Sequence, residues 1–196
     1  MKLKVFPAER QGQDFYLINS KDDRLYIQTS EEYVAALSNG YFAFGSFNIR
    51  RSYIFGLQVA IINALSDIQP PDESYISKLG VGLTSLSLLP ADILVSWGDA
   101  PSPSFGQGES VQDLVNNGRV IITEVSNYHV GLESEHDGWL LWEIMRGDLN
   151  ADGLEEMFVY RYSYIKRATL RVGEPLLLSR IDDQSLFDVT ALESHE

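Results

Sequence analysis

The strongest chemical signal in the sequence is a short acidic segment at residues 148–156, which we call the acidic loop. Acidic and amide side chains alternate in its first half, so their oxygen atoms can converge when the chain curls around an ion. Gly153 follows them, at a point where such a loop needs a sharp turn or a positive φ. Calcium takes several oxygen ligands of this kind. The sequence therefore predicts a Ca²⁺ site whose ligands are the side chains of Asp148, Asn150, Asp152 and Glu156 and the backbone carbonyl of Leu154.

The acidic loop does not follow the EF-hand pattern. An EF-hand has Glu at its twelfth position and continues into a helix, whereas Val159 occupies that position and residues 157–162 alternate like a strand. Asp, Asn and Gly also form tight turns without any metal, through hydrogen bonds from the backbone to their side chains. The sequence thus leaves two interpretations: a structural Ca²⁺ site that stabilises the fold by binding, and a metal-free turn.

The sequence from Gly147 to Glu156, GDLNADGLEE, resembles the D-x-[DN]-x-D-G-x-x-[DE] loops of FG-GAP and VCBS-type repeats, in which the loop joins two β-strands. It also resembles the GDxNxDGxED segment of uncharacterised bacterial proteins that carry a single copy of this loop. The resemblance covers roughly residues 138–180 and implies one calcium loop in a C-terminal sheet. Where the family pattern usually ends in Asp, this chain has Glu156, and the loop occurs once.

The composition limits the kinds of partner that the chain can bind. It has 196 residues and a net charge of −13, with 28 Asp and Glu against 15 Lys and Arg. Such a charge repels a nucleic-acid backbone and an anionic membrane, so neither nucleic-acid binding nor membrane insertion is expected. It can instead attract a basic protein partner or concentrate cations. The absence of cysteine excludes disulfides, thiolate metal sites and cysteine nucleophiles.

Outside the acidic loop the sequence carries no recognised catalytic motif. A Gly-x-Ser-x-Gly elbow, a Walker loop and a His-Glu-x-x-His zinc motif are all absent, and Gly80-x-Gly82 lacks the rest of a dinucleotide fingerprint. His136 lies between two acids, a combination that could bind a metal but is more typical of a solvated turn. No catalytic or cofactor-binding residue is therefore predicted.

Three functions remain compatible with the sequence. The first is a non-enzymatic bacterial domain with one structural calcium ion, which follows from the acidic loop. The second is an immunity or inhibitor protein that binds a toxin or another protein partner, which compactness and acidity favour. The third is a hydrolase that uses scattered carboxylates. The first residues lack the apolar core of a signal peptide, which indicates the cytoplasm, or the periplasm or exterior if Met1 replaces a removed leader.

The hydrophobic pattern predicts an α+β fold in a single domain, residues 1–196. The first part of the chain alternates in short runs and then takes helical spacing. Strands are predicted at Leu3–Phe6, Phe15–Asn19 and Leu25–Thr29, and helices at Ser30–Asn39, Ser52–Ile68, Glu73–Leu88 and from Ser110 to Asn116. Ser30 is expected to cap the first of these helices without a complete capping box. A flexible internal loop is expected at 99–109.

From residue 119 onward the hydrophobic period changes to two, and the connections are short and polar. This pattern predicts an antiparallel meander of strands at Val120–Val125, Tyr128–Glu133, Trp139–Met145, Met157–Tyr164 and Thr169–Leu178. Trp139 and Trp142 are expected on opposite faces of their strand, because their separation is odd. The next strand presents an all-tyrosine face, for which sheet packing is expected before a protein-binding role. A polar tail is expected at 182–196.

Overall fold

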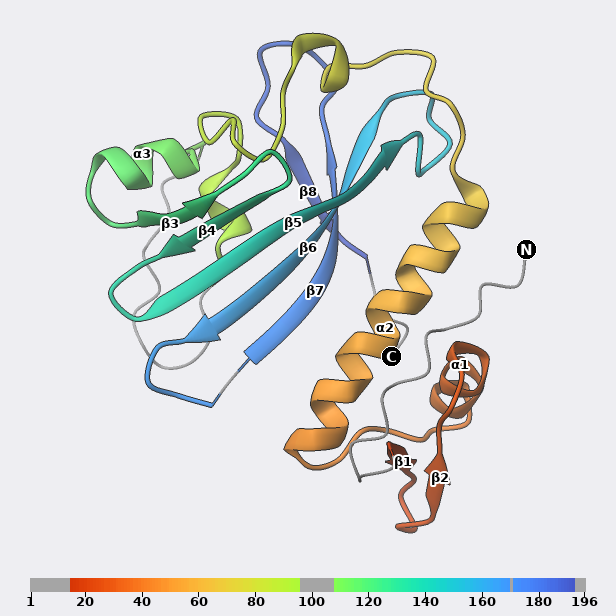
Figure 1. Ribbon diagram of the computed structural model, residues 1–196. Helices are drawn as coiled ribbons and strands as arrows, with labels where there is room; N and C mark the ends of the chain where they lie inside the picture. Colours follow the sequence, from red (N-terminus) through yellow and green to blue (C-terminus); the bar gives the residue numbers. More distant parts are fainter. Residues whose placement is uncertain (1–14, 96–107, 170, 193–196) are drawn as a thin grey trace. The chain divides into compact units, whose positions relative to one another are not determined.

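The computed structural model describes residues 15–95, 108–169 and 171–192 of the chain (Figure 1). They gather into two compact units, one ending at Asn63 and the other running from Ala64 to Leu192. The single domain stays a prediction, because compactness alone does not say whether either unit folds independently. The predicted strand at Leu3–Phe6 and nearly all of the loop at 99–109 lie outside the described residues. None of the described helices is both long enough and apolar enough to cross a membrane.

The first unit contains an antiparallel hairpin, a short helix and most of a long one. β1 (Tyr16–Ile18) pairs with β2 (Arg24–Tyr26), and α1 (Ser30–Ser38) and α2 (Ser46–Asp67) follow. Helix α2 begins six residues before the predicted start at Ser52, directly after a glycine that turns the chain with a φ of +80°. The boundary between the two units falls inside this helix.

Helix α1 is capped by Thr29, one residue before the cap that the sequence predicted. The Oγ1 atom of Thr29 accepts a hydrogen bond from the Glu32 N–H, and the Glu32 carboxylate accepts one from the Thr29 N–H, both at 3.2 Å. The prediction of Ser30 without a capping box was therefore wrong. Moving the cap by one residue places Glu32 three positions after it, which completes the capping box.

Three aromatic rings hold the first unit together. The ring centroid of Phe55 on α2 lies 5.0 Å from that of Phe15 and 5.6 Å from that of Tyr33 on α1. All three side chains are buried, and the Tyr33 hydroxyl forms a 2.7 Å hydrogen bond with Ser52. The rings therefore join the hairpin and both helices in one small core.

The predicted helix at Glu73–Leu88 is absent from this fully described stretch. The chain instead forms a 3₁₀ turn, η1 (Ser77–Leu79), then further turns, and a second 3₁₀ turn, η2 (Ala91–Ile93). Gly80 adopts the left-handed conformation, with a φ of +67°, and ends η1 after one turn. Most apolar residues of this stretch are buried in the core all the same (Ile76, Val81, Leu83 and Leu86), whereas Leu79 in η1 is exposed.

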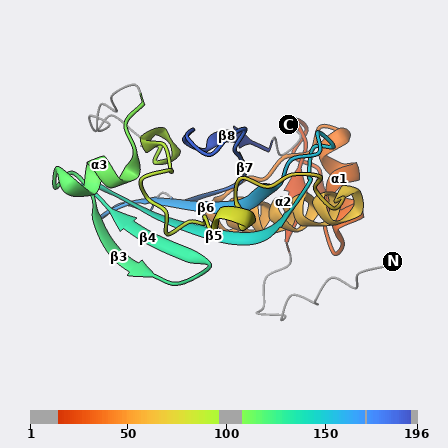
Figure 2. The same cartoon turned by 90° about the horizontal axis from the view of Figure 1, so that it is seen from above.

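The second unit is built on one six-stranded antiparallel sheet, whose strands pair in sequence order as β3-β4-β5-β6-β7-β8. Its elements are α3 (Val111–Asn116), β3 (Ile121–Val125), β4 (His129–Glu133), β5 (Asp137–Gly147), β6 (Glu156–Ile165), β7 (Arg171–Ser179) and β8 (Asp188–Ala191). The α+β class and the C-terminal meander are thus confirmed, and Figure 2 shows the twist of this sheet. Strand β8 lies within the predicted polar tail, to which the sequence pattern gave no element.

The two faces of the sheet differ, as the alternation predicted. Trp139 is fully buried in the core of the unit, whereas Trp142 lies half-buried on the other face and stacks on Tyr160 with ring centroids 6.2 Å apart. A Cβ added to Gly173 would lie 1.7 Å from the Tyr160 hydroxyl oxygen. The tyrosine ring therefore lies directly on the glycine backbone of the neighbouring strand, which is sheet packing.

Candidate metal centre

The acidic loop joins β5 to β6, the two longest strands of the sheet (Figure 1). The ladder between them has one register shift, between Glu143 and Met145, and then continues to Gly147 and Glu156, the residues at either side of the loop. A long hairpin therefore holds both ends of the loop at a fixed separation. The loop connects strand to strand, as its flanking sequence predicts.

The loop brings together three of the predicted ligands. One carboxylate oxygen from each of Asp148, Asp152 and Glu156 lies within 4.8 Å of the others. Two oxygens on opposite sides of a Ca²⁺ ion, each about 2.3–2.6 Å from it, would be roughly 5 Å apart. Asp148 and Glu156 are buried while Asp152 is exposed, so the cluster has two interior ligands and one at its opening to solvent.

Hydrogen bonds from the loop backbone fix two of these side chains. Asp148 Oδ1 accepts from the Asp152 N–H at 3.2 Å, and its Oδ2 accepts from the Gly153 N–H at 3.1 Å. Asp152 Oδ1 accepts from the Leu154 N–H at 2.8 Å. The side-chain Oδ1 of Asn150 also accepts from the Asp152 N–H, at 3.0 Å. These bonds are common to a metal-free turn and to a preformed metal site, so they do not distinguish the two.

The conformation of the loop agrees with one prediction and adds one surprise. Gly153 has a φ of +85°, which is the positive value expected at this position. Ala151 also has a positive φ, of +63°, although it is not a glycine. A non-glycine residue in this region stores about 1–2 kcal/mol of strain, which the hydrogen bonds of the loop must offset.

Glu156 is the residue that distinguishes a metal site from a bare turn. Its side chain is 0 % exposed, and its Oε2 accepts a hydrogen bond from the Leu149 N–H at 2.8 Å. Its Oε1 has no hydrogen-bond partner among the described residues. A buried carboxylate oxygen without a partner is costly, and a tight turn does not require one. A bound cation would satisfy it.

Burial raises the pKa of the Glu156 carboxyl to about 7; the charges of Asp152 and Asp148 also act to raise this pKa, while the Leu149 N–H group acts to lower it. In the described part of the chain, none of the three carboxylates forms an ion pair with Lys, Arg or His. The described part of the chain thus gathers three acids without a side-chain cation paired to them.

Glu155, next to Glu156 in the sequence, has the opposite environment. Its carboxylate accepts hydrogen bonds from the Ser74 hydroxyl at 2.5 Å, and from the Ser77 N–H at 2.9 Å and hydroxyl at 2.8 Å. Burial acts to raise the pKa of Glu155, but these hydrogen bonds and the charge of Arg146 together outweigh burial and hold the pKa below its ordinary value. Both carboxylate oxygens of Glu155 therefore accept hydrogen bonds within the fold, and the residue has a structural role. The sequence did not indicate this role.

A segment after α2 lies along the loop and pairs with its backbone; we call residues 69–77 the strap. Gln69 and Asp148 exchange N–H···O hydrogen bonds, each 3.0 Å long. The Gly153 carbonyl accepts from the N–H groups of Asp72 and Glu73 at 2.8 and 3.0 Å. The Glu155 hydrogen bonds to the strap serines complete the attachment. The loop is thus fixed by a segment about 80 residues away in sequence.

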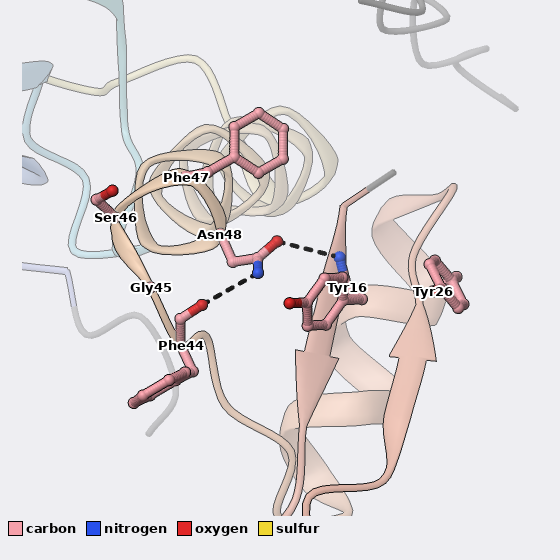
Figure 3. A pocket seen from close by; sticks show the side chains of 7 residues that line it. All are labelled: Tyr16, Tyr26, Phe44, Gly45, Ser46, Phe47 and Asn48. Carbon is pink, nitrogen blue, oxygen red and sulfur yellow. Dashed lines mark hydrogen bonds between the residues drawn. The ribbon is translucent and has the colours of Figure 1, made fainter. Parts of the chain in front are cut away.

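The other candidate sites are less complete. His136 is exposed in the turn before β5 and lies 4.0 Å from Glu135, so the metal site considered there has no third ligand among the described residues. A hollow of about 530 Å³ in the first unit is drawn in Figure 3. The amide of Asn48 within it is engaged by the Tyr16 N–H and the Phe44 carbonyl. Among the described residues that line this hollow there is no Asp, Glu, His, Lys or Arg, and Tyr16 and Tyr26 are its only ionisable groups.

Comparison with known protein families, curated proteins and solved structures finds no match for this chain. The functional argument therefore depends on the geometry of the acidic loop alone.

Proposed function

We propose that the chain is a non-enzymatic domain whose acidic loop binds one structural Ca²⁺ ion. The observation that carries the proposal is the Oε1 atom of Glu156, which is buried without a partner in a cluster of three carboxylates. A cation at the centre of the cluster would supply the missing partner and neutralise the repulsion between the acids. A metal-free turn accounts for the hydrogen bonds of the loop but not for this buried carboxylate.

The proposed ligands are one oxygen each from the side chains of Asp148, Asn150, Asp152 and Glu156 and from the Leu154 carbonyl. Five protein oxygens and a water on the exposed Asp152 side give a coordination number within the range of calcium. Magnesium demands shorter bonds of about 2.0–2.1 Å in a strict octahedron and usually keeps several waters. A loop that buries two of its carboxylates therefore favours calcium.

The role of the ion would be structural. It would join the two ends of the β5–β6 hairpin turn and stabilise the folded state by mass action, by roughly 2.7 kcal/mol when calcium is present at about 100 times its Kd. Among the described residues, this cluster is the one group of three acidic side chains close enough together to hold an ion. It contains no nucleophilic side chain next to a general base, which hydrolases commonly use. A structural ion therefore fits the site better than a hydrolase mechanism.

Titration calorimetry on chelator-treated protein tests the proposal. The wild-type chain should bind one Ca²⁺ ion and melt at a higher temperature in its presence. Asp152→Asn should weaken binding more than tenfold, because the exposed ligand loses its charge. Asp188→Asn, on the exposed strand β8, removes the same charge elsewhere and should leave binding unchanged. Absence of both heat and a melting shift in the wild-type protein would refute the calcium site.

A further inference from the structure

The strap and the acidic loop share the same backbone groups. Between positions 69 and 73 the strap contains Pro70 and Pro71, which have no N–H to donate. The remaining N–H groups are those of Gln69, Asp72 and Glu73. All three donate to carbonyl oxygens of the loop, at 3.0, 2.8 and 3.0 Å. The first half of the strap is therefore fixed by the loop through every N–H group that it has.

We propose that calcium in the acidic loop acts as a latch on the strap: the ion holds residues 69–73 against the loop, and its loss releases them. This inference rests on the proposed calcium site and adds a regulatory role to it. The coupling is geometric. Asp148 provides both a carboxylate of the cluster and the backbone groups that pair with Gln69. Any movement that separates the carboxylates therefore also strains the strap.

Gly153 provides the second link between the ion site and the strap. Its N–H donates to the Asp148 carboxylate at 3.1 Å, while its carbonyl accepts both N–H groups from Asp72 and Glu73. A Cβ at this position would lie 3.3 Å from the Asp72 carboxylate, so the strap packs closely over the turn. The peptide units around Gly153 thus connect the ligand cluster on one side to the strap on the other.

Charge provides the force that opens the latch. The strap places the acids Asp72 and Glu73 beside a loop that already holds three carboxylates. Without a cation these groups repel one another, and the repulsion acts across the backbone hydrogen bonds that close the latch. A divalent ion removes most of this repulsion, so binding of the ion favours the closed arrangement.

The second half of the strap is held differently. Ser74 and Ser77 bind the Glu155 carboxylate, which is not a proposed ligand. Release of calcium is therefore expected to free residues 69–73 while the serines stay attached. The freed residues follow closely after α2, which ends at Asp67. Occupancy of the metal site therefore controls whether the segment after this helix is held against the loop or free.

Residue-specific amide exchange of the full chain, measured by NMR with and without Ca²⁺, tests the latch. If exchange of the Gln69, Asp72 and Glu73 amides requires opening of the loop, saturation at 100 times the measured Kd should slow it about 100-fold. The Ser126 amide, which donates to His129 at 2.9 Å in the β3–β4 turn, serves as an internal control and should not change.

The outcomes separate the two proposals. If calorimetry finds no calcium binding, the proposed function fails and the latch fails with it. If calcium binds but the three strap amides exchange at unchanged rates, the latch alone is refuted. Equal slowing at Ser126 would also refute it, because it would indicate global stabilisation. In Asp152→Asn, which binds calcium more than tenfold more weakly, the same calcium concentration should slow the strap amides by less than about tenfold.

Discussion

Replacing Glu156 by Gln removes the charge of the buried carboxylate and keeps its size, so the substitution isolates the electrostatic cost of the metal-free loop. In the folded chain the pKa of Glu156 is raised from its usual 4.5 to about 7. At about 1.4 kcal/mol per pKa unit, ionising the folded protein costs roughly 3 kcal/mol more than ionising the unfolded chain. Gln does not ionise, so without calcium at pH 8 the variant should be more stable than the wild type.

The free energy of unfolding should rise by about 1–3 kcal/mol, because the side-chain N–H₂ group of Gln takes the place of the Glu156 oxygen that has no hydrogen-bond partner. The sign follows from linkage. As pH rises from 4.5 to 7 the folded chain keeps a proton that the unfolded chain loses, so the wild type loses stability over this range. Near pH 5 most of the cost of ionising Glu156 in the folded chain has not yet appeared. The Gln variant should therefore be more stable than the wild type by less than about 1 kcal/mol at this pH.

Urea unfolding with a chelator, at pH 5 and pH 8, provides the measurement. With saturating calcium at pH 8 the order should reverse, because the wild type gains the binding free energy and the variant loses a ligand. Glu155→Gln is a matched control of opposite sign: its carboxylate has a lowered pKa, so losing the charge should destabilise the chain at pH 8. If Glu156→Gln destabilises the metal-free protein at pH 8, the unpaired-carboxylate argument is refuted.

Three further predictions follow from single contacts. Gly153→Ala and Gly40→Ala both place a Cβ on a positive φ, of +85° and +76°, but only the first meets the strap, 3.3 Å from the Asp72 carboxylate, so it should cost up to about 1 kcal/mol more; equal losses would contradict this. Trp139→Phe removes the indole N–H that donates to Val95 at 2.8 Å and should cost roughly 1–3 kcal/mol in urea unfolding. Calcium affinity should fall as pH drops below about 7, because protons compete for Glu156, and a pH-independent Kd would count against its role as a ligand.

The sequence predicted the sheet well because its signal is local. The strands of the meander are short runs rich in apolar, β-branched and aromatic residues, separated by polar connections. The helix at Glu73–Leu88 was wrong because apolar spacing outweighed Gly80, whose left-handed φ ends the turn. Strand β8 was missed because it is only four residues long and three of them are exposed; its pairing with β7 and the packing of Val189 on the core define it.

The candidate ligands could be named from the sequence because they lie within nine consecutive residues, and the positive φ of Gly153 is confirmed. The environment of the loop could not be predicted. Ser74 and Ser77 bind Glu155 across 81 and 78 residues of sequence. No local pattern reveals such contacts, nor which of two adjacent glutamates faces inward without a partner. The burial of Glu156, which carries the functional argument, therefore required the structure.

A crystal structure of the chain grown with calcium tests the central claim most directly. The account predicts one ion in the acidic loop, bound about 2.3–2.6 Å from Glu156 Oε1 and from oxygens of Asp148, Asn150, Asp152 and Leu154. The strap should pair with the loop as it does here. A loop that remains free of metal at millimolar calcium, with Glu156 Oε1 bonded to water instead, would contradict the account.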